Sequence, residues 1–376
     1  MSGRGLLTIV EMSDSVRKTL VVPAQAHALS CMPQRRSTYA TGSSPAGMTE
    51  NLSCICVILI RSPSVEFRNV GRSGLRVSLV GLGCNNFGGR IDLAATRLVV
   101  HRALDLGITL FDTADNYGNL GGSESQLGET LGDRRKDIVL ATKFASPMTK
   151  AETLRCASRR YIMSAVEASL TRLRTDWIDL YQLHWPDPLT PIEETLRALE
   201  DLVRQGKVRY IGCSNLPAWQ VADAVWTSRC HELAAFISAQ DEYSLLARDA
   251  ERELLPALTT LGLGLFPYYP LAGGLLTGKY KRGKPLPEGA RLTYTKASAD
   301  RFLHERNWTK VEQLERFCSE RGHSLVELAF AWLAARPPVA SIIAGATRPE
   351  QIDANVKAVA WQLTAAEIAE VDRISA

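Results

Sequence analysis

From Glu66 to the C-terminus, the sequence alternates short apolar runs with longer segments of helical period. This alternation predicts parallel strands joined by helices, because a strand covered on both faces is apolar throughout, whereas a surface helix is apolar on one side only. Several runs have this character and are predicted to be strands. They are Val77–Gly81, Thr109–Asp112, Ile138–Lys143, Trp177–His184, Tyr210–Ser214, Phe236–Gln240, Leu263–Pro267 and Ser341–Ile343.

The segments between these runs carry signals for the ends of helices. Thr190, Pro191 and Glu193 predict an N-cap, a first-turn proline and a capping-box acid. Gly206 predicts the end of the same helix. The capping-box pattern returns in Thr364–Glu367 near the C-terminus. Predicted helices include Ala94–Leu106, Arg160–Leu173, Pro191–Gln205 and Trp308–Arg321.

Eight predicted strands that alternate with helices favour a closed (β/α)8 barrel, for which roughly 250 residues plus insertions are usual. The alternative is an open doubly wound sheet, which requires a glycine-rich turn after its first strand. Gly81 and Gly83 match two positions of that turn, but no third glycine follows at the required offset. We therefore predict an α/β fold of the (β/α)8 TIM barrel type.

Composition restricts the class of protein. The chain has 376 residues, of which 45% are hydrophobic and 22% charged, and its net charge is +4, as in an ordinary globular protein. This balance argues against a nucleic-acid or membrane-surface partner. Eight cysteines without a CxxC pair indicate a reduced, cytoplasmic protein without a cysteine metal site.

The N-terminal part differs from the rest. Residues 1–64 mix Ser, Thr, Pro and Ala without a lasting period, so we expect a disordered or dispensable extension, followed by one barrel domain at residues 65–376. The apolar run Cys54–Ile60 is much shorter than the roughly 20 residues of a membrane-spanning helix.

Polar side chains follow five consecutive predicted strands. In a barrel of parallel strands, these carboxyl ends open on one face, where the active site is built. The polar residues at these ends are Asp112 with Tyr117, then Lys143, His184, Ser214 with Asn215, and Gln240.

The residue types at these strand ends are typical of a site that donates a proton. A tyrosine, with an unperturbed pKa of roughly 10, remains an acid at neutral pH, and a nearby ammonium stabilises its phenolate. A carboxylate positions the ammonium, and a neutral histidine can donate a hydrogen bond to a carbonyl oxygen as negative charge develops on it. This combination favours carbonyl reduction. Neither a serine or cysteine nucleophile with a base nor a metal-binding spacing is present, so hydrolase and metalloenzyme functions are disfavoured.

Five segments resemble signatures of the aldo-keto reductase family, in the order in which that family carries them. The resemblance extends from Phe67 to Ile374. The chain looks bacterial-type and is broadly similar to the branch that includes potassium-channel β subunits. The resemblance also implies that the fold begins with a small hairpin at Phe67–Gly74. The segments are Gly107–Gly118, Leu140–Lys143, Asp179–Asp187, Ile211–Asn215 and Gln240–Ser244.

The resemblance implies roles for the strand-end residues. Tyr117 would be the general acid that protonates the carbonyl oxygen. Lys143 and Asp112 would tune its acidity, and His184 would orient and polarise the carbonyl group.

The resemblance also implies a nicotinamide cofactor. Ser214, Asn215 and Gln240 would hold the nicotinamide carboxamide, and Tyr268 would stack under the ring. The loop over the pyrophosphate would use Leu271, Gly273, Leu275, Lys279 and Arg291.

The adenosine phosphate would bind after the last strand, where Thr347 is predicted to cap a helix whose free N–H groups face an anion. The residues at contact positions there would be Gly345, Thr347, Arg348, Gln351 and Asn355. Gly345 and Gln351 stand where many family members carry Lys and Arg for the 2′-phosphate of NADPH. Because Arg348 can supply the missing charge, we expect NADPH, with NADH as the alternative. Tyr269 replaces a serine that often contacts the pyrophosphate.

The expected function is reduction of an aldehyde or ketone by an NADPH-dependent oxidoreductase with a small-molecule carbonyl substrate. Two alternatives stay open: an NAD(P)-dependent sugar dehydrogenase, and an NADPH-binding regulatory or sensor subunit with little turnover. The sequence leaves the substrate and the oligomeric state open. Specificity is expected from the loops at Ala145–Arg159, Thr227–Leu233 and Arg282–Glu305, where apolar residues could shape a pocket but more often pack helices.

Overall fold

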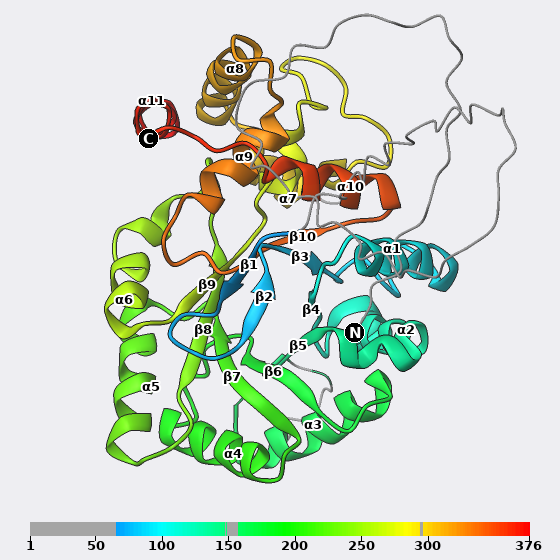
Figure 1. The fold of residues 1–376 in the computed structure, drawn as a ribbon, viewed down its shortest axis with the longest axis vertical. Helices are drawn as coiled ribbons and strands as arrows, with labels where there is room; N and C mark the ends of the chain where they lie inside the picture. Colours follow the sequence, from blue (N-terminus) through cyan, green and yellow to red (C-terminus); the bar gives the residue numbers. More distant parts are fainter. Residues whose placement is uncertain (1–64, 147, 149–156, 294–295) are drawn as a thin grey trace, which may run out of the picture. The chain divides into compact units, whose positions relative to one another are not determined.

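A computed structural model of the chain describes residues 65–146, 148, 157–293 and 296–376 (Figure 1). All of these residues belong to one of the chain's two compact units, Leu59–Ala376. The predicted extension at residues 1–64 lies outside the described residues. No helix in the described part is long and apolar enough to cross a membrane.

Eight parallel strands form a barrel at the centre of the fold, in the order β10-β3-β4-β5-β6-β7-β8-β9. A parallel bridge between Leu265 in β9 and Val339, just before β10, joins the two edges. The predicted (β/α)8 architecture is confirmed. The strands are β3 (Val80–Gly83), β4 (Leu110–Asp112), β5 (Val139–Phe144), β6 (Ile178–Leu183), β7 (Val208–Ser214), β8 (Phe236–Glu242), β9 (Gly264–Tyr268) and β10 (Ile342–Gly345).

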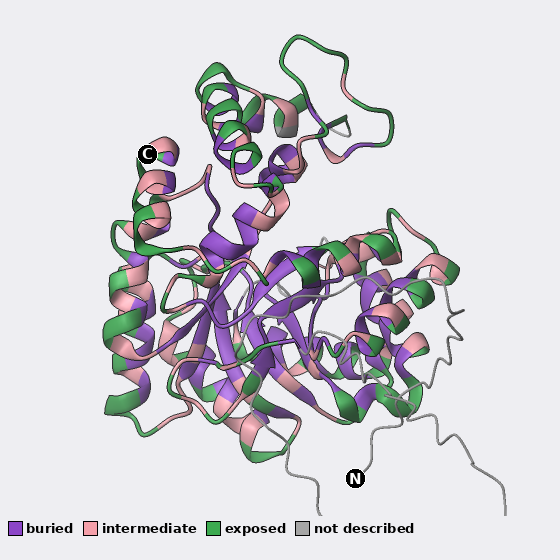
Figure 2. Cartoon of the chain, turned by 45° about the horizontal axis from the view of Figure 1, so that its top comes forward, coloured by how far each residue is buried: buried purple, intermediate pink, exposed green. Residues whose placement is uncertain are grey.

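Helices make the outer layer, and Figure 2 shows the buried strands inside a ring of helices whose outer faces are exposed. Helices α1 to α6 follow one another around the barrel, and α10 lies between α1 and α9. The helices are α1 (Leu93–Asp105), α2 (Tyr117–Leu131), α3 (Arg159–Leu173), α4 (Ile192–Arg204), α5 (Ala218–Cys230), α6 (Leu254–Leu261), α7 (Lys296–Phe302), α8 (Glu305–Ser319), α9 (Leu325–Ala334), α10 (Pro349–Ala358) and α11 (Ala365–Ser375).

The predicted hairpin is present as β1 (Phe67–Asn69) and β2 (Arg76–Ser78), which pair antiparallel. The predicted first barrel strand, Val77–Gly81, is wrong in its bounds because it joins the end of β2 to the start of β3. The chain changes direction at Leu79, whose N–H donates to the carbonyl of Glu66. Nearly every side chain in this run is buried, so its hydrophobicity carries no sign of the break.

The structure confirms two of the predicted helix ends and contradicts the predicted start of α4. Thr364 and Glu367 form the predicted capping box of α11, and α4 ends just before Gly206, whose φ is +75°. The predicted cap at Thr190 is wrong: α4 has Pro191 at its N-cap without a side-chain bond. The Thr190 hydroxyl instead bonds to Asp187, three residues earlier in the chain.

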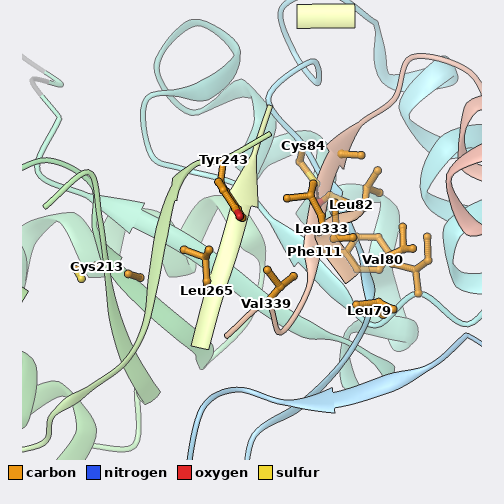
Figure 3. Close-up of a cluster of buried hydrophobic side chains, with 14 of the residues drawn as sticks. Leu79, Val80, Leu82, Cys84, Phe111, Cys213, Tyr243, Leu265, Leu333 and Val339 are labelled. Atoms are coloured by element: carbon orange, nitrogen blue, oxygen red, sulfur yellow. Dashed lines mark hydrogen bonds between the residues drawn. The ribbon is translucent and has the colours of Figure 1, made fainter. Parts of the chain in front are cut away.

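An apolar layer fills the space between the barrel and its helices. Figure 3 shows side chains from β3, β4 and β9 meeting Leu333 of α9 and Val339. Tyr243, after β8, packs against Trp332 of α9 with ring centroids 5.0 Å apart. Apolar side chains therefore cover most of both faces of the sheet.

We predict that Gly128→Ala destabilises the protein, although alanine favours helices. Gly128 lies in α2 where the helix touches the end of α3, and an added Cβ would sit 2.4 Å from the carbonyl oxygen of Arg172. The expected loss is about 1–3 kcal/mol of unfolding free energy, measured by urea denaturation. Gly74→Ala is the control, because its Cβ would meet nothing nearer than 3.8 Å. Unchanged stability of Gly128→Ala would contradict this packing.

Candidate active site

The parallel direction of the barrel strands brings the predicted polar residues to one mouth of the barrel. Asp112 and Ser214 end β4 and β7, Lys143 and Gln240 lie near the ends of β5 and β8, and His184 directly follows β6. These five residues are buried. Residues far apart in sequence are therefore assembled into one cluster, as expected for this fold.

The central contact of the cluster is an ion pair. The Nζ of Lys143 lies 2.6 Å from Oδ2 of Asp112 and also donates to the carbonyl of Thr113 at 2.9 Å. The Lys143 side chain is completely buried. Burial by itself would lower the pKa of Lys143, but Asp112 and Tyr117 raise it above its ordinary value, so the ammonium stays charged.

Amide groups fix the carboxylate of this pair. Oδ1 of Asp112 accepts hydrogen bonds from Nε2 of Gln240 at 2.9 Å and from Nε2 of Gln182 at 3.2 Å. With Lys143 on Oδ2, both carboxylate oxygens have partners, so the ion pair is held in one orientation.

Tyr117 lies beside the ammonium, with its ring centroid 5.1 Å from Nζ of Lys143. Burial around the hydroxyl raises the pKa of Tyr117 above its ordinary value, and Lys143 partly counters this effect. The phenol is therefore protonated at neutral pH, next to a cation that stabilises its anion. The backbone needs a glycine directly after it: Gly118 has a φ of +65°, and a Cβ there would lie 2.2 Å from the carbonyl oxygen of Phe87.

His184 completes the catalytic group that the sequence predicted. Its ring stands edge-on to Tyr117, with centroids 5.7 Å apart, and stacks on Trp185 at 5.5 Å. Burial, and after it the charge of Lys143, lowers the pKa of His184 to about 3. The imidazole is neutral at neutral pH and can donate a hydrogen bond without carrying a charge.

The predicted carboxamide-binding residues form a second hydrogen-bonded group. Ser214 Oγ donates to the carbonyl of Gln240 at 2.7 Å, and Asn215 Nδ2 donates to the carbonyl of His184 at 2.9 Å. The Tyr268 hydroxyl donates to Oδ1 of Asn215 at 2.8 Å. This group joins the strand ends to the aromatic ring predicted to stack on a nicotinamide.

A cavity of about 760 Å³ opens at this mouth. Lys143, Leu275 and Asn355 are not part of its wall. Lys143 lies behind Tyr117 and Asp112, and the other two side chains are buried in the packing around it. The predicted residues that do line the cavity are Asp112, Tyr117, His184, Ser214, Asn215, Gln240, Tyr268, Leu271, Gly273, Lys279, Arg291, Gly345, Thr347, Arg348 and Gln351.

Several lining residues were missed from the sequence. Asn85 and Asn86 come two and three residues after the end of β3, so they carry the same signal as the other strand-end residues. Trp185 is next to His184. Arg90 lies in no recognisable motif and reaches the wall through a bond from its NH2 group to the carbonyl of Gly289 at 3.2 Å.

The far end of the cavity is cationic. Lys279, Arg90, Arg291 and Arg348 line it in the described part of the chain, with the carboxylate of Glu288. Partial burial, and then these three arginines, lower the pKa of Lys279 from its ordinary value. Mutual repulsion among the cations is relieved by an anion, so this end suits phosphate groups.

Tyr269 holds one of these cations. The Arg291 guanidinium lies 4.7 Å above the Tyr269 ring, and its NH2 group donates to the Tyr269 hydroxyl at 3.1 Å.

Gly273 lies in the segment that connects Tyr269 to Arg291, and it has a φ of +66°. A Cβ on Gly273 would lie 2.8 Å from Leu292, so the loop passes too closely for a side chain.

The predicted cap at Thr347 is wrong in detail. Arg348 occupies the N-cap of α10, and Oε1 of Gln351 accepts bonds from the N–H groups of Thr347 and Arg348 at 2.7 and 3.3 Å. A glutamine side chain therefore satisfies backbone groups that we expected to face an anion. Thr347 and Arg348 still line the cavity.

The expected specificity loops are described only in part. Cys156 and Tyr294 lie outside the described residues. Leu292, Phe302 and Trp308 are buried in the apolar core. These three residues therefore pack in the core and do not line the cavity.

Comparison with known proteins agrees with this geometry. The family model described as "Aldo/keto reductase family" matches residues 79–376. The chain is 38% identical to a probable voltage-gated potassium channel subunit beta of Oryza sativa subsp. japonica, over 78% of this chain and 91% of the relative. It is 39% identical to an uncharacterised oxidoreductase, YrpG, of Bacillus subtilis, with the same coverage of each chain. It is 32% identical to L-glyceraldehyde 3-phosphate reductase of Escherichia coli K12, over 83% of this chain and 93% of the relative.

The buried lysine–carboxylate pair, the protonated tyrosine, the neutral histidine and the cationic end of the cavity lie within the matched residues. The chain belongs to the aldo/keto reductase family and is an NAD(P)H-dependent oxidoreductase.

Proposed function

We propose that the protein reduces an aldehyde or ketone to an alcohol with NADPH, and that Tyr117 is the general acid. One observation carries this proposal: a protonated tyrosine, a buried ammonium and a neutral histidine meet at one end of a cavity whose other end is cationic. The first end suits a carbonyl group that gains a proton, and the second suits a phosphorylated cofactor.

Each residue of the first end has a distinct task. Bound nicotinamide supplies the hydride. Tyr117 donates its proton to the carbonyl oxygen, and Lys143 stabilises the phenolate that remains. Asp112 holds the ammonium, and His184 donates a hydrogen bond that orients the carbonyl and stabilises the developing negative charge.

The lining of the cavity supports the binding of a dinucleotide. Ser214, Asn215 and Gln240 place polar groups beside the proton donor, and Tyr268 offers a ring next to them. The glycine loop at Gly273 allows close approach of a backbone to the pyrophosphate.

The cationic end favours NADPH over NADH. We assign Lys279 and Arg291 to the pyrophosphate and Arg348, at the start of α10, to a 2′-phosphate, because all three line the cationic part of the cavity. NADPH carries a 2′-phosphate in addition to the two phosphates of the pyrophosphate. Arg348 supplies a positive charge for this third phosphate, which NADH lacks.

The alternatives from the sequence predict different outcomes. A sugar dehydrogenase would run the same proton and hydride transfer in reverse, and product analysis with oxidised and reduced cofactor separates the two directions. A regulatory subunit, as in the name of the Oryza relative, would bind NADPH tightly with little turnover.

We predict that Tyr117→Phe lowers the rate of NADPH oxidation with an activated aromatic aldehyde by about 100-fold or more, because the proton donor is lost. Absorbance of NADPH measures the rate, and fluorescence quenching shows whether cofactor binding is retained. Tyr210→Phe, a change in β7 away from the cavity, is the control. Wild-type turnover by Tyr117→Phe would overturn its role as the acid. NADPH binding without turnover on a broad carbonyl panel would favour the regulatory alternative.

We predict that Arg348→Gln weakens NADPH binding about tenfold or more and leaves NADH binding unchanged, because the variant loses a charged partner of the 2′-phosphate. Titration of each cofactor by fluorescence measures both dissociation constants. Arg204→Gln removes an exposed arginine of α4 that pairs with Glu200, and it should change neither constant. Equal weakening for both cofactors would move Arg348 away from the 2′-phosphate.

The low pKa of His184 gives a stability prediction. Its pKa of about 3 in the folded protein lies below the roughly 6.5 of the unfolded chain, so its contribution to stability is present above pH 6.5 and is lost as the pH falls towards 3. Between pH 6.5 and 4, wild-type stability should therefore fall by roughly 2–3 kcal/mol more than that of His184→Gln, measured by urea denaturation. His231→Gln, which changes an exposed histidine, should follow the wild type. Parallel curves for all three proteins would show that His184 is not buried as a neutral ring.

A further inference from the structure

The neutral imidazole of His184 has a buried partner that the proposed mechanism does not use. Nδ1 of His184 lies 3.1 Å from Oγ of Ser146, two residues after the end of β5. His184 is 6% exposed and Ser146 is 2% exposed, so water has little access to the bond between them.

The number of hydrogen-bond partners of the Ser146 hydroxyl indicates which group donates in this bond. A neutral imidazole carries one N–H, on either Nδ1 or Nε2, and a serine hydroxyl can donate or accept. Among the described residues, Oγ of Ser146 has no hydrogen-bond partner other than His184. If Nδ1 donated to the serine, the hydroxyl hydrogen would be buried without an acceptor. If the serine donates to Nδ1, one bond satisfies both groups, so this direction is favoured.

The serine is held in place from outside the cavity. Its carbonyl accepts a hydrogen bond from the Tyr161 hydroxyl of α3 at 2.8 Å. That hydroxyl also lies 3.1 Å from Oδ2 of Asp115, which is buried between the barrel and α3. The backbone reaches Ser146 through Ala145, which has a φ of +75°, a conformation that turns the chain sharply at the strand end. The backbone of Ser146 is therefore anchored to α3, outside the cavity.

We propose that Ser146 is a positioning residue whose hydroxyl donates to Nδ1 of His184 and thereby keeps the ring proton on Nε2. This inference rests on the proposed function, in which His184 donates a hydrogen bond to a carbonyl oxygen. His184 forms part of the cavity wall, and Nε2 lies on the side of the ring opposite the Ser146 contact. The other tautomer would offer the substrate a lone pair, which repels a carbonyl oxygen.

The tautomer itself is the first test. Two-bond ¹H–¹⁵N correlation spectra of histidine-labelled full-length protein distinguish a protonated ring nitrogen from an unprotonated one. The His184 signals are assigned by their loss in His184→Gln. In the wild type at pH 7, we expect a protonated Nε2 and an unprotonated Nδ1, and in Ser146→Ala we expect a mixture of both tautomers. A protonated Nδ1 in the wild type, or an unchanged tautomer in Ser146→Ala, would overturn the proposal.

Kinetics of carbonyl reduction are the second test. Ser146→Ala should lower kcat about tenfold, since part of the enzyme then holds the wrong tautomer, while the dissociation constant of NADPH stays unchanged. Ser146→Thr keeps the hydroxyl and should restore most of the rate together with the single tautomer. Ser228→Ala removes another buried serine hydroxyl, which bonds to the carbonyl of Ala234 at 3.0 Å in the region of α5, and it should leave kcat unchanged. A wild-type kcat in Ser146→Ala would overturn the proposed role.

The two tests separate this proposal from the proposed function. If the wild type reduces no carbonyl compound but shows the expected tautomer and its loss in Ser146→Ala, the reductase proposal fails and the serine–histidine bond stands. If the wild type is an active reductase and the tautomer is reversed, the serine proposal fails and the reductase proposal stands.

Discussion

Lys143 and Asp112 form an ion pair inside the mouth of the barrel, and the geometry of the rest of the site depends on it. A completely buried ammonium requires a charged partner, because removal of that partner leaves an uncompensated charge in the interior. The carboxylate that supplies the partner also accepts hydrogen bonds from Gln182 and Gln240. The carboxylate of Asp112 therefore connects β4 to β5, β6 and β8. Its ion pair with Lys143 also sets the position of the cation beside Tyr117.

The cavity combines two electrostatic environments at opposite ends. Around Tyr117 and His184, burial favours the neutral forms, so a phenol and an imidazole both carry protons that they can share with a carbonyl oxygen. Around Lys279, partial burial and then the neighbouring arginines lower the pKa of that ammonium. The barrel keeps the two environments apart because the strand ends form the first, whereas the loop after β9 and the start of α10 form the second.

The polar residues at the strand ends could be predicted from the sequence, because the signal for them is a local pattern. Asp112 and His184 could be recognised because each polar residue interrupts or follows an apolar run, and parallel strands bring such ends together. Asn85, two residues after β3, carries the same signal. The break between β2 and β3 escaped prediction, since it depends on the contact of Leu79 with Glu66, thirteen residues earlier in the chain.

The sequence by itself determined the strand–helix alternation, the barrel class and the residue types at the strand ends, because apolar periodicity and chain punctuation are local properties. Only the tertiary structure decided which side chains face the cavity and which protonation states they hold. Leu275 lies in the packing, Arg90 reaches the wall, and Ser146 contacts His184. Burial and the distance between charges set these outcomes, and both arise only when segments far apart in the chain pack against one another.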